Sequence, residues 1–458
     1  MTSSDTICVR DNSRGAIFAA LDGGGAVMTK NKYKVLLVLI FWSVTGQISA
    51  LAGELDNKRC NTLPSNAEIC KISIVQGSRT FQYSYEIKRA KPGAPTIIAI
   101  PGGPGQGLIG SMNMVKNGDF IPDEFGIILI DPRGTGKNEF GADPEGQLYS
   151  TMHVAADILE IIRQEKLSNY FIHGQSYGTA VATVLGHMLS GSNVAPARGI
   201  ILTGVVTSFF DDPLWGYNAQ LHRLLSHYSS DQQIHIRENL LKIQNEFGDS
   251  KRTFAILFLS LLTPNVEDAS SDGKNNVNMK RFFDLMAQGA FDRANQAIGL
   301  FYETAAEVGR SEKPPASFRN NTMPEVIKCR ELTRNDAMLD LIFDFEKFKL
   351  VSMVTDCQKK GYTLDRPYLS EKYQITGIPI YYIQGLLDPA TPIEGAKHHF
   401  DHQQTRSKVF VQLDNYSHNA LTGLWRCKSD LWKSFTLGIA SFKKHIQACD
   451  RTEIRLVE

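Results

Sequence analysis

The amino-acid sequence predicts an α/β fold in which helices cover both faces of a mostly parallel β-sheet. From Phe81 onward, short apolar runs alternate with helix-length segments. Strands that are apolar throughout are typical of a parallel sheet buried on both faces. The alternation stops near Ser208 and resumes near Ile378, which predicts a helical insertion, here called the cap, after the sixth strand.

Length and composition agree with a single large α/β core that carries an insertion. The chain has 458 residues, of which 42% are hydrophobic and 21% are charged, and this is ordinary globular composition. We expect a leader over residues 1–52, the first part of the core over 53–207, the cap over 208–372 and the second part of the core over 373–458. The formal net charge of +1 and the lack of a basic run give no support for a nucleic-acid partner.

The N-terminal region has the pattern of a secretory signal peptide over about residues 28–52. Lysines precede the apolar run Val35–Val44, and Ala50-Leu51-Ala52 forms a small-x-small cleavage site. An uncleaved membrane anchor or a buried helix is the alternative, but ten strongly apolar residues are too few to span a bilayer. We therefore expect an exported protein, periplasmic or secreted, with no stable membrane anchor after cleavage. Met28 is a second candidate start.

Six cysteines remain once the leader is removed, and an even count in an exported chain predicts disulfides. The candidates are Cys60, Cys70, Cys329, Cys357, Cys427 and Cys449. The first two and the middle two are each close enough in sequence to close a loop. One straight helix of 22 residues would hold the last two about 33 Å apart, so either that helix breaks, for example at Gly438, or the pairing is different. No cysteine or histidine cluster has zinc spacing, and we expect no metal.

The predicted elements follow one another as strand, loop and helix. Helical periodicity is clear over His153–Leu167 and Ala180–Leu189, and a final helix begins at about Ser429. The cap contains amphipathic stretches such as NAQLHRLLSHY and RFFDLMAQGAFDRANQAI. The predicted core strands lie at Pro95–Ile100, Phe125–Ile130, Asn169–Ile172, Arg198–Val206, Ile378–Gln384 and Ser407–Leu413.

A serine between two glycines follows the third of these strands. In Gly174-Gln175-Ser176-Tyr177-Gly178, the glycines let strand and helix pass closely, and the serine takes a strained conformation that projects its hydroxyl above the sheet. The N–H of Tyr177 then lies at a helix N-terminus, where it can bind a developing oxyanion. A plain surface turn is the alternative interpretation, but the strand before and the apolar helix after favour a nucleophile elbow.

A glycine-rich loop follows the strand Pro95–Ile100. In Pro101-Gly102-Gly103-Pro104-Gly105, the backbone can approach a substrate carbonyl, and we predict the N–H of Gly103, with Gly102 close behind, as the second oxyanion donor. The overlapping run Gly105–Gly110 fits GxGxxG, and Asp131 then stands where a ribose-binding acid would lie. Two prolines interrupt that turn, and an exported enzyme meets little NAD, so we expect no dinucleotide and no other cofactor.

The loops after the last two predicted strands supply an acid and a base. Asp388 follows Ile378–Gln384 in Gly385-Leu386-Leu387-Asp388-Pro389, and His418 follows Ser407–Leu413. Ligand sites of parallel sheets form at the carboxyl ends of strands, and the order Ser176, Asp388, His418 matches nucleophile, acid and base. A turn aspartate and an exposed loop histidine are the ordinary alternatives. The rival histidines His398, His399 and His402 fall in what the sequence predicts to be a surface helix.

These motifs together resemble the α/β-hydrolase serine peptidases of the prolyl aminopeptidase (proline iminopeptidase) and tripeptidyl aminopeptidase group. The resemblance rests on PGGPG, on the strand end Asp131-Pro132-Arg133-Gly134-Thr135-Gly136, on GQSYGT and on GLLDPATP. It implies an α/β-hydrolase fold and a Ser-Asp-His triad, with Asp131 and Arg133 as a structural pair. Pro101 replaces the family's usual histidine. Tyr177 replaces the tryptophan of the prolyl enzymes and points toward the tripeptidyl branch.

The expected activity is release of residues or short peptides from peptide N-termini through an acyl-enzyme. A carboxylesterase would use the same triad, and only its cap would differ. Epoxide hydrolases and haloalkane dehalogenases place an aspartate where Ser176 stands, and a binding protein would have no need of all three triad residues. Four cap carboxylates are candidates for binding a substrate amine, without a preference among them: Asp211, Asp212, Glu303 and Glu307.

Overall fold

The structure is a computed structural model that describes most of the core and part of the cap. The described residues are 58–63, 66–118, 121–138, 140, 147–207, 213–247, 279–296, 322–332, 357, 361–427, 430–449 and 451–457. The predicted leader and the four candidate cap carboxylates lie outside these residues. Within the described part, none of the helices combines the length and the hydrophobicity that crossing a bilayer requires.

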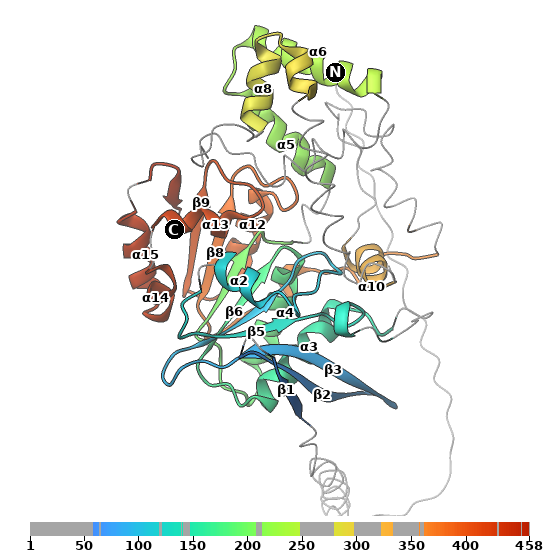
Figure 1. Cartoon of the computed structure of the whole chain (residues 1–458), viewed down its shortest axis with the longest axis vertical. Coiled ribbons are helices and arrows are strands. Elements are labelled where there is room, and N and C mark those ends of the chain that lie inside the picture. The colour runs from blue at the N-terminus through green and yellow to red at the C-terminus, as the bar shows by residue number, and fades with distance from the viewer. Residues whose placement is uncertain are drawn as a thin grey trace, which may run out of the picture. The chain divides into compact units, whose positions relative to one another are not determined.

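Ten strands form one sheet in the order β1-β2-β3-β5-β4-β6-β7-β8-β9-β10 (Figure 1). The ladders that join β5, β4, β6, β7, β8 and β9 are parallel, and the described strands outside them pair antiparallel. This confirms the predicted α/β class with a mostly parallel central sheet. The strands are β1 Arg59–Thr62, β2 Glu68–Gln76, β3 Arg79–Lys88, β4 Thr96–Ile100, β5 Gly126–Ile130, β6 Tyr170–Gln175, β7 Gly199–Thr203, β8 Ile380–Gly385, β9 Lys408–Leu413 and β10 Ile454–Leu456.

Two apolar layers enclose the central strands because alternate side chains point to opposite faces. In β4, Ile98 and Ile100 pack in one cluster with α3 and α4, whereas Ile97 and Ala99 pack in the other with α2, α14 and α15. The core helices are α2 Met112–Gly118, α3 Thr151–Gln164, α4 Tyr177–Ser190, α12 Ile393–His402, α13 Ala420–Gly423, α14 Leu431–Thr436 and α15 Ile439–Gln447, with short helical turns η1 Gly136–Asn138, η5 Ser370–Lys372 and η6 Leu424–Cys427.

The described helices of the insertion between β7 and β8 are α5 Pro213–Leu225, α6 Ser230–Phe247, α8 Met279–Ala287 and α10 Thr322–Ile327, followed by the π-helical turn η3 Lys328–Leu332. Helices α5, α6 and α8 pack around an apolar cluster that includes Leu224, Phe282 and Phe283. Helix α10 instead packs in the core cluster that contains α3 and α4. The insertion follows the seventh strand, not the sixth. Strands β1, β2 and β3 come before the first strand listed from the sequence, and β1, whose four residues are all exposed, has no apolar pattern.

Three disulfides join the six predicted cysteines as Cys60–Cys70, Cys329–Cys357 and Cys427–Cys449. The last pair forms because the chain between its cysteines is not one helix. Helices α14 and α15 are separated at Gly438, whose φ of 91° ends the first and reverses the chain into the second. The two Cα atoms of that pair consequently lie 5.1 Å apart.

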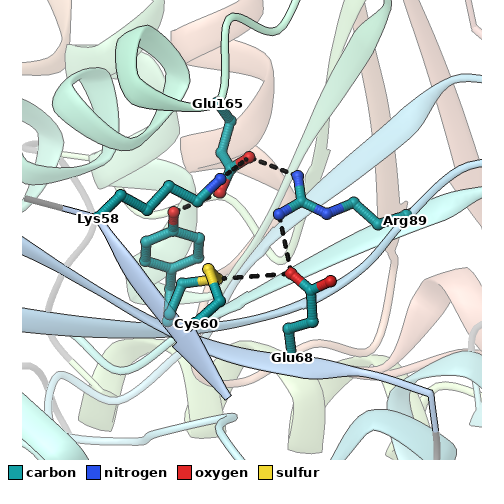
Figure 2. Close-up of a disulfide and its surroundings, with 7 residues drawn as sticks. Lys58, Cys60, Glu68, Arg89 and Glu165 are labelled. Carbon is teal, nitrogen blue, oxygen red and sulfur yellow. Dashed lines mark hydrogen bonds and ion pairs between the residues drawn. A yellow bond between two sulfur atoms is a disulfide. The ribbon is translucent and has the colours of Figure 1, made fainter. Parts of the chain in front are cut away.

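The Cys60–Cys70 disulfide ties β1 to β2 beside a network of buried and half-buried charges (Figure 2). Glu165, which caps the C-terminus of α3, accepts bonds from Lys58 Nζ at 2.8 Å and Arg89 NH1 at 2.5 Å, and also from the Tyr85 hydroxyl. Burial alone would raise the pKa of the Glu165 carboxyl, but these donors outweigh it, and the pKa lies below its ordinary value. The network fastens the first strands to α3.

Candidate active site

Ser176 lies at the corner between β6 and α4, with φ 54° and ψ −126°. A positive φ is uncommon for any residue with a Cβ and is a recognised form of stored backbone strain. The corner is tight: a Cβ at Gly174 would overlap the backbone of Gly178, and a Cβ at Gly178 would overlap the carbonyl of Ile100. Both glycines are therefore required by close approach, and Ser176 has the geometry of a nucleophile elbow.

The predicted oxyanion loop passes directly against this corner. A Cβ added at Gly102 would lie 2.9 Å from Ser176 Cβ, so the loop can occupy its position only with glycine there. Gly103, the predicted donor, is exposed and has φ 111°. Tyr177, the other predicted donor, begins α4 and is buried, and the first N–H groups of a helix have no partner within that helix.

His418 and Asp388 contact each other directly. His418 Nδ1 lies 2.9 Å from Asp388 Oδ2 and 3.1 Å from Oδ1. Since an ionised carboxylate only accepts hydrogen bonds, Nδ1 carries the proton and Nε2 is left to act as a base. Burial would lower the pKa of His418, but the charge and the hydrogen bond of Asp388 outweigh it and raise the pKa above its ordinary value.

Asp388 is fully buried and its carboxylate is held on several sides. It accepts from the N–H groups of Ala390 and Thr391 at 2.9 and 3.0 Å, and from the Thr391 hydroxyl at 2.5 Å. Gln384 Nε2 donates to Asp388 Oδ2 at 3.2 Å, and Gln384 Oε1 accepts from Val205 N. Gln384 and Thr391 stand in the same loop motif as Asp388, but no pattern in the sequence assigned them a function of their own.

The loops that carry Ser176 and His418 meet at the end of β7. Ser176 N donates to Thr203 O at 2.9 Å, and a Cβ at the next residue, Gly204, would lie 3.0 Å from His418 Cε1. The neighbours of the two residues are joined, since Gln175 Nε2 donates to Asn419 Oδ1 at 2.7 Å. Among the described residues, the Ser176 hydroxyl and the His418 ring share no hydrogen bond. Catalytic hydrogen bonds are often long in the absence of substrate.

Asp131 and Arg133, the two residues expected to be structural, have separate partners and do not bond to each other. Asp131 accepts from the N–H groups of Ile109 and Lys137 at 2.9 and 2.8 Å, whereas Arg133 Nε donates to Asp157 at 2.7 Å. Both Asp131 and Arg133 are buried and structural. The two residues have different partners because their side chains differ in length. The short side chain of Asp131 bonds to the turns on either side of it, while the long side chain of Arg133 extends to α3.

The rival histidines lie on α12, as the sequence predicts, but His399 is not on a surface. It is 1% exposed and makes hydrogen bonds with Thr183 and Tyr382. Burial lowers the pKa of His399 to about 3. Its ring is therefore a neutral core group.

The chain is similar to known proteins over part of its length. Residues 95–220 match the family described as the alpha/beta hydrolase fold. A probable proline iminopeptidase of Leptolyngbya boryana is 28% identical over 137 residues, and a proline iminopeptidase of Neisseria meningitidis is 27% identical over 143 residues. These matches cover 29% and 31% of this chain and 38% and 42% of the relatives, so the chain matches about two fifths of each relative's length.

Among solved structures, the chain resembles the proline iminopeptidase of Mycobacterium smegmatis, at 13% identity and a TM-score of 0.44 over 83% of this chain and all of that one. It also resembles an esterase of Exiguobacterium antarcticum, at 13% identity and a TM-score of 0.38 over 79% of this chain and 96% of that one. The sheet topology and the match over residues 95–220 agree with the α/β-hydrolase fold, and the chain is similar to proline iminopeptidases over about a third of its length.

Proposed function

We propose that this α/β hydrolase is an exported serine aminopeptidase that releases residues or short peptides from peptide N-termini. The observation that carries the proposal is the contact of His418 Nδ1 with both oxygens of Asp388 beside a serine held at positive φ. This combination prepares a base and a strained nucleophile at one edge of the sheet. The similarity to proline iminopeptidases supports the peptide substrate.

The proposed reaction is acyl transfer in two steps. His418 Nε2 takes the proton of Ser176, whose oxygen attacks the scissile carbonyl and forms a tetrahedral oxyanion. The N–H groups of Gly103 and Tyr177 stabilise that charge. The protonated His418 then gives its proton to the departing amine, and water, activated by the same imidazole, hydrolyses the acyl-enzyme and restores Ser176.

The second candidate is a carboxylesterase, which would use the same residues. Two assays on purified protein separate the two: hydrolysis of aminoacyl and tripeptidyl naphthylamides, and hydrolysis of p-nitrophenyl acyl esters. We expect a higher kcat/KM on the amides. Activity on the esters alone would replace the aminopeptidase proposal with the esterase.

The serine mechanism itself is tested by Ser176→Ala. Removal of the nucleophile from a triad costs about 10⁶ in kcat, so we expect loss of turnover and of labelling by a fluorophosphonate, with an unchanged fold by circular dichroism. The control is Ser417→Ala: Ser417 lies on the histidine loop, where its hydroxyl donates to Leu387 O. Wild-type turnover in the Ser176 variant would refute the proposal.

Export is supported by the three disulfides, which persist in oxidising compartments. Expression of the full sequence followed by mass spectrometry of the protein outside the cytoplasm tests it. We expect an N-terminus directly after Ala52. Retention of the uncleaved chain in the cytoplasm would contradict export.

A further inference from the structure

One segment of the cap, residues 322–332, packs against the loop that carries one predicted oxyanion donor and is linked through Thr151 to the side chain of the other. We call this segment, made of α10 and η3, the cap turn. On one side, a Cβ at Gly105 would overlap the ring of Pro324, so Pro324 packs against the loop that carries Gly103. On the other side, Glu331 Oε2 accepts from the Thr151 hydroxyl at 2.6 Å, and Thr151 is the hydrogen-bond partner of Tyr177.

The donors and acceptors in the hydrogen bonds that join Glu331, Thr151 and Tyr177 can be assigned. Thr151 N lies 3.1 Å from Glu331 Oε2, and Thr151 Oγ1 lies 3.2 Å from the Tyr177 hydroxyl. A threonine hydroxyl has one proton, and an ionised carboxylate accepts only. With Glu331 ionised, Thr151 donates its proton to Glu331 and accepts that of Tyr177. Burial and the charge of Glu331 both raise the pKa of Tyr177, which keeps its phenol a donor.

All three members of this chain of hydrogen bonds are buried: Thr151 is 3%, Tyr177 1% and Glu331 7% exposed. A buried polar group that loses its partner incurs its full desolvation cost, so the three side chains resist moving independently. Tyr177 is also the residue whose N–H begins α4, directly after Ser176. A displacement of its ring therefore moves the backbone that would bind the oxyanion.

We propose that Glu331 and Thr151 are positioning residues that hold Tyr177, so that the cap turn sets the geometry of the oxyanion hole from both sides. The inference rests on the serine hydrolase mechanism proposed above. It goes beyond that mechanism because it makes transition-state stabilisation depend on a segment of the inserted cap. The disulfide at Cys329, two residues before Glu331, holds this segment to Cys357.

The test compares Thr151→Val with Thr151→Ser. Valine has the shape of threonine but no hydroxyl, while serine keeps the hydroxyl. Loss of an oxyanion donor costs about 10²–10³ in kcat. In T151V the donor would be displaced and not lost, so we expect a smaller effect. The kcat should fall about tenfold, and KM should stay within about twofold of wild type. T151S should stay within about threefold of wild type. The rate of phosphonylation by a fluorophosphonate, whose P=O oxygen occupies the same hole, should fall in parallel with kcat.

Two further variants separate positioning from general destabilisation. Tyr177→Phe should match T151V, and the double variant should be no worse than either single one, because both remove the same link. Glu165→Gln is the matched control, since Glu165 is a buried carboxylate that caps the C-terminus of α3, whereas Thr151 begins that helix. It should lower the melting temperature and leave the phosphonylation rate unchanged.

Three outcomes would overturn the inference. One is a folded T151V protein with wild-type kcat and phosphonylation rate. Another is an equal loss of rate in E165Q, because that loss would reflect stability alone. The third is a wild-type protein that does not react with the probe, which would refute the serine mechanism and this inference with it. The first outcome, in contrast, would refute the inference and leave the serine mechanism intact.

Discussion

Replacement of Asp388 by asparagine tests the electrostatic support of the proposed base. The new side chain would keep the shape of the old one and remove its charge, while the N–H groups of Ala390 and Thr391 would still find an oxygen. Asp388 is fully buried and touches His418 through both carboxylate oxygens. The substitution therefore removes the nearest negative charge from an imidazole that must become positive during the reaction.

The magnitude follows from Coulomb's law. The two charge centres lie about 4 Å apart, and at an effective dielectric constant of about 20 their attraction is about 4 kcal/mol. That corresponds to about 10³ in rate, since each 1.36 kcal/mol is a factor of ten. The amide can also favour the wrong tautomer of the imidazole, and the same substitution in a serine-protease triad costs about 10⁴. We expect a fall in kcat of about 10³ to 10⁴.

The assay is kcat/KM against pH for the wild type and for Asp388→Asn. The pKa of wild-type His418 is raised by Asp388, and the base acts when neutral, so kcat/KM should rise with pH through a value above the ordinary 6.5. In the variant burial remains and the carboxylate is gone, so the rise should move to lower pH. Asp414→Asn is the control, because Asp414 also follows β9 but pairs with Arg455. A loss below about tenfold, or an equal loss in the control, would refute the assignment.

Three other outcomes are expected. Substitution of both Cys329 and Cys357 by serine opens a loop with a sequence separation of 28. It should destabilise the protein by about 3–4 kcal/mol in denaturant titrations, and an unchanged midpoint would contradict it. Arg133→Met leaves the carboxylate of Asp157 buried without its partner and should cost about 3–5 kcal/mol, whereas Arg133→Met with Asp157→Leu should recover most of that loss. Finally, His418→Ala should abolish turnover, because it removes the proposed base; an active variant would contradict that role.

The central strands and the loops after them could be predicted because their signals are local. Thr96–Ile100 and Gly126–Ile130 are buried at every position, and a short apolar run bounded by turn residues already indicates such a strand. The serine corner is local as well, because the glycines on either side of Ser176 are required by close backbone contacts at the corner itself. Strands β1, β2, β3 and β10 were not among the predicted strands, because β1 and β10 contain no buried residue and β2 and β3 are only partly buried.

The partners of buried polar groups could not be predicted in the same way. Nothing near Arg133 in the sequence distinguishes Asp157 from Asp131 as its partner, and the choice depends on how α3 packs against the sheet. The burial of His399 depends on which face of α12 meets β8, through Tyr382. These contacts join residues that are far apart in the chain, where sequence spacing carries no information about distance.

By itself, the sequence determined the class of fold, the six cysteines available for disulfides and the three residues expected to carry the chemistry. Those features follow from periodicity, from residue type and from the fact that parallel strands end at one edge of a sheet. Only the tertiary structure decided that His418 meets Asp388, that Gln175 joins Asn419 and that Glu331 of the cap reaches Tyr177 through Thr151. Such contacts arise when packing brings distant segments together, and a hydrogen bond requires an accuracy of a few tenths of an ångström that no local pattern specifies.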